Sequence, residues 1–125
     1  MAEAHVALGD ILRGEKKYSE AVSAYDSAIK YSPEVNDNWA IHYSRGIALD
    51  RAKNWDAAEK DFRKALELRP DDPSVLNYLG YSMIEKKINL PEALDMVKKA
   101  VELKPNDGYI TDSLGWAYFQ LGDYD

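Results

Sequence analysis

The strongest constraint on this chain is a group of small residues and prolines that recurs along it in nearly constant phase. A glycine, two alanines and a proline follow one another three times, and the glycine returns once more. These markers are Gly9, Gly46, Gly80 and Gly115, then Ala21 with Ala28, Ala58 with Ala65 and Ala93 with Ala100, and finally Pro33, Pro70 and Pro105. The period of 34 to 37 residues predicts an all-α solenoid of helical hairpins, because a unit of this length cannot bury its own apolar face.

Each recurring unit divides into two expected helices, which we call A and B in chain order. In the first B helix, Ala21, Ala24, Tyr25 and Ala28 are spaced by three and four residues, which places them on one helical face. The glycine of each A helix is expected to lie opposite the small alanines of B. A glycine weakens a helix by about 1 kcal/mol relative to alanine, and a close approach of the two backbones would offset that cost.

Short polar residues predict where several of these helices begin. Asp72 before Pro73 is typical of an N-cap followed by proline in the first helical turn, and Asp107 stands in the same place one unit later. Asp56 with Glu59 predicts a capping box at the start of the second B helix.

The phased residues resemble the signature of the tetratricopeptide repeat family over essentially the whole chain. In the first two copies they are Leu8, Gly9, Leu12, Tyr18, Ala21, Tyr25, Ala28 and Pro33, then Gly46, Leu49, Trp55, Ala58, Phe62, Ala65 and Pro70. In the last two they are Leu76, Leu79, Gly80, Met83, Leu90, Ala93, Val97, Ala100 and Pro105, then Leu114, Gly115, Tyr118, Gly122 and Tyr124. The resemblance implies a right-handed α-solenoid of antiparallel hairpins in a single domain, 1–125. Its repeats would span 2–35, 39–72 and 73–107, with the first half of a truncated fourth at 108–125.

The end of the sequence leads us to expect a segment of a longer protein. After Asp123, Tyr124 and Asp125 the family would place the residues that open a second helix in the fourth copy. The last two copies resemble the late repeats of long multi-repeat proteins of Gram-negative bacteria. The compartment, bacterial cytoplasm or cell envelope, would follow from the parent protein.

Composition narrows the classes of function. The formal net charge of -6 disfavours nucleic acid as a partner, because neutralising phosphates needs a basic surface. No apolar run approaches the ~20 residues of a membrane span, so we expect no membrane insertion within this segment. The chain has no cysteine and no phosphate loop, nucleophile elbow or catalytic triad. We therefore expect no catalytic residue, cofactor or metal ion, and a scaffold in place of an enzyme.

Three residues carry charge or imidazole where the family places packing side chains. His5 and His42 occupy equivalent positions between helices, so we interpret both as packing residues and not as metal ligands. Arg45 stands where the other copies have leucine. The resemblance implies that Asp61, just before Phe62, neutralises it within the same repeat.

The resemblance also implies that the functional surface is a concave groove lined by the A helices. The positions carried over are Val6, Asp10, Arg13, Tyr43, Ile47, Asp50, Arg51, Asn77, Tyr81, Ile84, Glu85, Tyr109, Asp112 and Trp116. Aromatic side chains in a groove typically anchor a peptide, and the carboxylates favour a protein or peptide ligand of some basic character.

A second function stays open beside peptide binding, and one ligand class is disfavoured. Trp116 and Phe119 could pack on a further helix and not on a ligand, which favours a structural or self-associating segment that pairs through its last A helix. Relatives that clamp chaperone C-termini use Lys, Asn, Asn, Lys and Arg in the groove. The matching positions here are Val6, Asp10, Ile47, Asn77 and Tyr81, so capture of chaperone tails is not expected.

The spacing between repeats is irregular at one junction. Gly46 stands thirteen positions after Pro33, whereas Gly80 stands ten positions after Pro70. The three extra residues fall within 34–38 and are interpreted as tolerated loop variation, because lengthening a surface loop costs little.

Overall fold

The chain is described by a computed structural model over residues 2–122, which contain seven α-helices, one 3-10 helix and no strand. In chain order these are α1 (Ala2–Gly14), α2 (Tyr18–Tyr31), η1 (Pro33–Asp37), α3 (Trp39–Arg51), α4 (Trp55–Leu68), α5 (Pro73–Glu85), α6 (Leu90–Leu103) and α7 (Gly108–Gln120). The expected all-α helical-repeat solenoid class is confirmed, with α1, α3, α5 and α7 as A helices. Tyr124, which we assigned to the fourth copy, lies outside the described residues.

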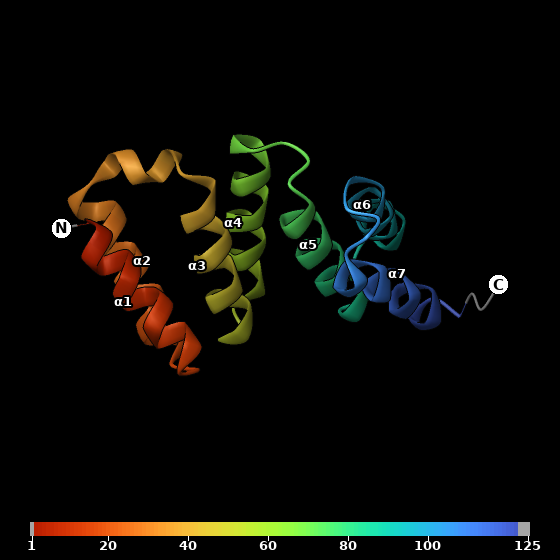
Figure 1. Ribbon diagram of the computed structural model, residues 1–125. Coiled ribbons are helices and arrows are strands. Elements are labelled where there is room, and N and C mark those ends of the chain that lie inside the picture. The colour runs from red at the N-terminus through yellow and green to blue at the C-terminus, as the bar shows by residue number, and fades with distance from the viewer. Residues whose placement is uncertain (1, 123–125) are drawn as a thin grey trace. The chain divides into compact units, whose positions relative to one another are not determined.

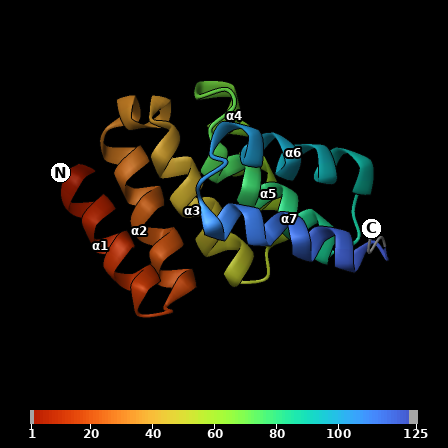
Figure 2. The same ribbon diagram turned by 45° about the vertical axis from the view of Figure 1, so that its right-hand side comes forward.

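The helices gather into two compact units, Met1–Pro70 and Asp71–Asp125. In the first unit α1 packs along α2, α3 packs along α4, and α2 joins the two hairpins by packing on α3 (Figure 1). In the second unit α5 packs along α6, and α7 lies against both α6 and α5 (Figure 2). No helix among residues 2–122 is long and apolar enough to span a bilayer.

The A-to-B turns repeat one hydrogen-bonding scheme. Lys16, Lys53 and Lys87 each adopt a left-handed backbone conformation, with φ of 64°, 67° and 57°. In the first turn the next amide, Lys17 N–H, donates to the Leu12 carbonyl at 2.8 Å, and the other two turns contain the equivalent bond. This Schellman arrangement satisfies the last carbonyls of α1, α3 and α5 and reverses the chain after each of them.

The hairpin interiors are built from the small and aromatic residues of the B helices. Ala21, Tyr25 and Ala28 in α2 are fully buried, and Ala58, Phe62 and Ala65 occupy the same places in α4. Two glycines of the A helices are placed differently from our expectation. A Cβ added at Gly46 would meet the Phe62 ring at 2.8 Å, and Gly9 faces the ring of Tyr25 in the same way. Gly9 and Gly46 therefore make room for an aromatic ring, whereas Gly80 lies close to the backbone of Ala93, as expected.

Two of the three expected helix caps are confirmed. Asp72 Oδ1 accepts the Val75 N–H at 3.1 Å, and Asp107 Oδ1 accepts the Ile110 N–H at 3.2 Å. The capping box at Asp56 is wrong, because α4 begins one residue earlier, at Trp55, with Asn54 as its N-cap residue. Asp56 lies instead in the first turn, where its negative charge favours the helix dipole.

Candidate functional site

A buried ionic cluster joins α3 to α4. Arg45 donates from Nε to Asp61 Oδ2 and from Nη2 to Asp61 Oδ1, both at 2.8 Å. This bidentate geometry confirms the pair expected from the sequence. Arg45 Nη1 also donates to Asp26 of α2 at 2.9 Å, so the guanidinium links two hairpins. Asp61, the carboxylate shared by this cluster, is only 5% exposed, so the centre of the cluster lies inside the unit and serves its architecture.

His42 belongs to the same cluster, which the sequence did not indicate. Its Nδ1 lies 3.1 Å from Asp61 Oδ1, and its Nε2 lies 2.8 Å from the carbonyl oxygen of Asn36 in η1. Both ring nitrogens therefore face oxygen acceptors, and both contacts are hydrogen bonds at once only when the ring carries two protons. His42 thus connects η1 to the buried core of the hairpin.

The other histidine packs at the surface end of the first hairpin. His5 stacks on Tyr31, with 5.4 Å between the ring centroids and 15° between the planes. Within residues 2–122 no group of three or more His, Asp or Glu side chains is placed to hold a metal ion.

A cavity of about 440 Å³ opens between α1 and α3 in the first unit, and we call it the α1/α3 cavity. Its apolar wall comes from Val6, Ala7, Val35 and Ile41. Its polar lining comes from Glu3, Asp10, Asn38 and Ser44. Two expected groove positions, Val6 and Asp10, thus lie together at one hollow surface. The segment 34–38, which contains the three extra residues of this junction, lines part of the cavity. Val35 belongs to η1, and Asn38 directly follows it.

The carboxylate of Asp10 is oriented by Tyr25 of the neighbouring helix, α2. Tyr25 Oη donates to Asp10 Oδ1 at 2.6 Å, and Arg13 Nε donates to Tyr25 Oη at 3.3 Å. Burial, together with the bond to Asp10, raises the pKa of Tyr25 to about 12. The tyrosine therefore keeps its proton at neutral pH and holds one oxygen of Asp10. Arg13 approaches the same oxygen only to 3.9 Å.

The remaining groove positions of the first unit lie on α3 and are only partly accessible. Tyr43 is half-buried, with its ring 6.0 Å from Trp39 and 6.2 Å from Phe62 between centroids. Ile47 and Asp50 are also of intermediate exposure, and Arg51 is exposed.

In the second unit Asn77 and Ile84 depart from the expected open groove. They are 4% and 1% exposed, and Asn77 Oδ1 is a buried atom that has no hydrogen-bond partner among the described residues. The two positions are two helical turns apart and so share one stripe of α5. Because α5 is buried over most of its circumference, that stripe offers no surface to a ligand.

Aromatic residues gather where α5 meets α7. Tyr109 is 74% exposed, Trp116 is 39% exposed and Phe119 is 55% exposed. Trp116 and Phe119 stack with 5.6 Å between centroids. Burial, followed by the nearby carboxylate of Glu85, raises the pKa of Tyr81, while a hydrogen bond from Trp116 opposes that shift. Four side chains therefore lie close together: Tyr81 and Glu85 of α5, and Tyr109 and Trp116 of α7. Asp112 is also exposed on α7.

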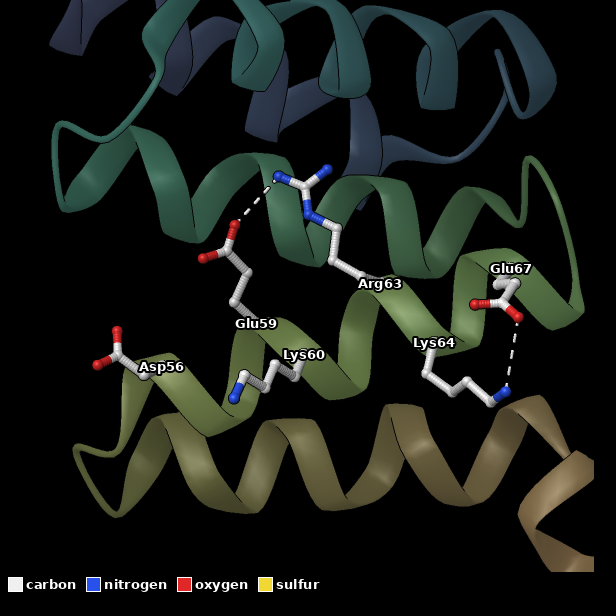
Figure 3. Close-up of a pocket in the computed structure, with 6 residues that line it drawn as sticks. All are labelled: Asp56, Glu59, Lys60, Arg63, Lys64 and Glu67. Carbon is white, nitrogen blue, oxygen red and sulfur yellow. Dashed lines mark hydrogen bonds and ion pairs between the residues drawn. The ribbon is translucent and has the colours of Figure 1, made fainter.

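A second depression runs along α4 and is lined only by charged side chains of that one helix (Figure 3). Arg63 Nη2 lies 3.1 Å from Glu59 Oε2, and Lys64 Nζ lies 3.6 Å from Glu67 Oε1 (Figure 3). Such pairs three and four residues apart are typical of a solvated helix face. They offer no apolar anchor and no convergent polar groups for a ligand.

The chain has clear relatives among known proteins. Residues 6–73 match the family model of the tetratricopeptide repeat. Over 73 residues, 58% of this chain, the sequence is 30% identical to the E3 ubiquitin-protein ligase CHIP of Arabidopsis thaliana. The match covers 25% of that ligase, so the chain spans about a quarter of the length of this curated relative.

Solved structures agree on the fold. The first tetratricopeptide repeat domain of human RPAP3 superposes with a TM-score of 0.84 at 24% identity, over 99% of this chain and 94% of that one. The first such domain of Spaghetti (RPAP3), bound to the HSP90 peptide SRMEEVD, superposes with a TM-score of 0.83 at 24% identity, over 97% and 93%. Because the family match spans more than half of the chain and the hairpins agree with it, this protein belongs to the tetratricopeptide repeat family.

Proposed function

We propose that this chain is a non-enzymatic protein-interaction module that binds a peptide or protein segment along the exposed faces of its A helices. Domains of the family typically mediate protein–protein interaction. The observation that carries the proposal is the exposure of Tyr109, Trp116 and Phe119 on α7. Large apolar side chains that gather on a surface are the usual anchors of an interface. We also propose the repeat bounds 2–35, 39–72, 73–107 and 108–125 given above.

The charge of the A-helix faces indicates the character of the partner. Among the groove positions, the carboxylates of Asp10, Glu85 and Asp112 are exposed and outnumber the one exposed cation, Arg51. The Spaghetti domain binds a peptide that ends in Glu, Glu, Val and Asp. At the positions where relatives clamp such tails, this chain carries Val6 and Asp10 and no cation. The proposed ligand is therefore an apolar segment with basic residues, because acidic faces attract cations and repel acidic tails.

Replacing Trp116 with alanine is expected to weaken binding of a partner segment by about 1–2 kcal/mol, because its partly exposed ring would be an interface anchor. The partner is obtained by affinity capture with the full chain, and its binding segment is then titrated by calorimetry. Leu103→Ala on α6 is the matched control, since Leu103 is 44% exposed on a B helix of the same unit. The proposal fails if both variants bind as tightly as the parent chain, or if both weaken binding equally.

Self-association through α7 is a second candidate, and one specific observation favours it. A Cβ placed on Gly115 would meet no heavy atom of the described residues within 4 Å, whereas the equivalent glycine Gly80 lies against α6. One face of α7 is thus uncovered. Sedimentation at several concentrations separates the two functions: a dimer lost in Trp116→Ala supports self-association, and a concentration-independent monomer supports a separate ligand.

A further inference from the structure

We propose that the α1/α3 cavity is a specificity pocket for one lysine or arginine side chain of the bound segment. This inference rests on the proposed function and adds the chemistry of one contact. A cation on an aliphatic stem fits a site that is apolar inside and negative at its rim, and the α1/α3 cavity has both properties.

The interior of the cavity is lined by apolar side chains that the hydrophobic core holds in place. Ile41 is 3% exposed and belongs to the hydrophobic core of the first unit. Val6 of α1 and Val35 of η1 pack against that same core. Because these side chains are held by the packed interior, the cavity is largely formed before a ligand arrives. The methylene stem of a lysine or arginine would bury its apolar surface there.

The rim of the cavity carries two carboxylates. Glu3 and Asp10 are two helical turns apart on α1, so both line the same side of the cavity. Tyr25 holds Asp10 in place, and the side chain of Glu3 makes no hydrogen bond or ion pair with the described residues. None of the residues that line the cavity is lysine or arginine. Arg13 reaches Asp10 only at 3.9 Å, which leaves the rim with a negative charge.

The inserted residues between the first two repeats close one side of the pocket. Pro33 to Gly46 is three residues longer than the equivalent stretch before Gly80, and η1 occupies this stretch. The bond between His42 Nε2 and the Asn36 carbonyl fixes η1 to the ionic cluster. Val35 is therefore a stable wall and not part of a loose loop. The shorter junction before Gly80 has no counterpart of this wall among the described residues.

The test uses the full chain and three defined probes. Acetylated, amidated heptapeptides of sequence Gly-Ala-Leu-X-Leu-Ala-Gly carry lysine, norleucine or glutamate at X. Norleucine keeps the aliphatic stem and removes the charge, and glutamate reverses the charge. Amide resonances are followed by NMR during each titration. We expect the lysine peptide to shift Val35, Ile41 and Ser44 and to bind at least about fivefold more tightly than the norleucine peptide, with the glutamate peptide weakest.

Variants of the two rim carboxylates then test whether they cause the preference for the lysine peptide. Glu3→Gln and Asp10→Asn are each expected to weaken the lysine peptide by about 3-fold to 10-fold and to leave the norleucine peptide unchanged. Asp10→Asn keeps an oxygen that accepts from Tyr25, so the fold is preserved. Glu20→Gln, on the exposed face of α2, is the matched control and should change neither peptide.

Three outcomes would overturn the inference. The lysine and norleucine peptides bind equally, or the rim variants leave the lysine peptide unchanged, or the lysine peptide causes no shift at Val35, Ile41 and Ser44 even at about 10 mM. The proposed function is tested separately by the captured segment with Trp116→Ala. If that segment binds through α7 while its basic residues can be replaced by norleucine without effect, the module function stands and the pocket assignment is wrong.

Discussion

Replacing Asp61 with alanine is expected to lower the free energy of unfolding by about 3 kcal/mol, because it leaves the Arg45 guanidinium inside the first unit without its carboxylate. Arg45 would lose two hydrogen bonds of 2.8 Å, and His42, which is 3% exposed, would lose the carboxylate at its Nδ1. Urea unfolding of the variant and the parent chain measures the loss. A decrease in the thermal midpoint should accompany it.

The control for this prediction is Asp26, the member of the ionic cluster that is most exposed to solvent. Asp26 accepts from Arg45 but its side chain is 57% exposed, so Asp26→Ala should cost under about 1 kcal/mol. Arg45→Leu combined with Asp61→Ala should recover part of the loss, because leucine occupies this position in the other copies. Equal losses for Asp26→Ala and Asp61→Ala, or additive losses in the Arg45 and Asp61 cycle, would show that the cluster is not coupled as described.

The same carboxyl makes stability depend on pH in the acid range. Burial opposes ionisation of Asp61, but hydrogen bonds from Arg45 and His42 outweigh it and hold its pKa below the ordinary value of 3.8. The contribution of Asp61 is therefore fully present above that ordinary value and is lost as the pH falls through the lower, folded-state pKa. Urea titrations at about pH 7, 4 and 3 should show a gap between the parent chain and Asp61→Asn that narrows toward acid. A gap that does not change with pH contradicts this assignment.

Gly80→Ala is expected to lower the free energy of unfolding by about 2–3 kcal/mol, because α6 already fills the space that the new methyl group would need. The new Cβ would lie 2.8 Å from the backbone carbonyl oxygen of Ala93 and 2.8 Å from Val97 Cγ2. A backbone oxygen inside a helix cannot move aside as the end of a flexible side chain can. The better helix propensity of alanine, about 1 kcal/mol, offsets only part of the clash.

Gly115 provides the matched control within the same unit. It is also a mid-helix glycine in the same phase of its repeat, but no described residue lies within 4 Å of a Cβ built there. Gly115→Ala should therefore stabilise the chain by up to about 1 kcal/mol through helix propensity alone. Urea unfolding of the two variants measures the difference. If Gly80→Ala proves as stable as Gly115→Ala, the close approach of α5 to α6 is not as tight as the structure has it.

The repeating architecture could be read from the sequence because its causes are local and periodic. The phase of glycine, alanine and proline, the three-and-four spacing around Tyr25, and the caps at Asp72 and Asp107 each depend on residues close in the chain. The need of Arg45 for a partner was also accessible, because an unpaired charge at a position otherwise held by leucine is costly, and the resemblance to the family implied that the partner is Asp61. The resemblance to the family supplied the list of A-helix groove positions, but not the exposure of each side chain.

Only the tertiary structure decided how the elements are turned toward one another. The burial of Asn77 and Ile84, the recruitment of His42 to the ionic cluster and the contact of Gly46 with the Phe62 ring all depend on the rotation of one helix against another. The role of η1 as a cavity wall depends on where a three-residue insertion folds back. Rotations and loop paths are set by close packing of side chains distant in sequence, and a periodic pattern fixes which face of a helix is buried without specifying what it meets.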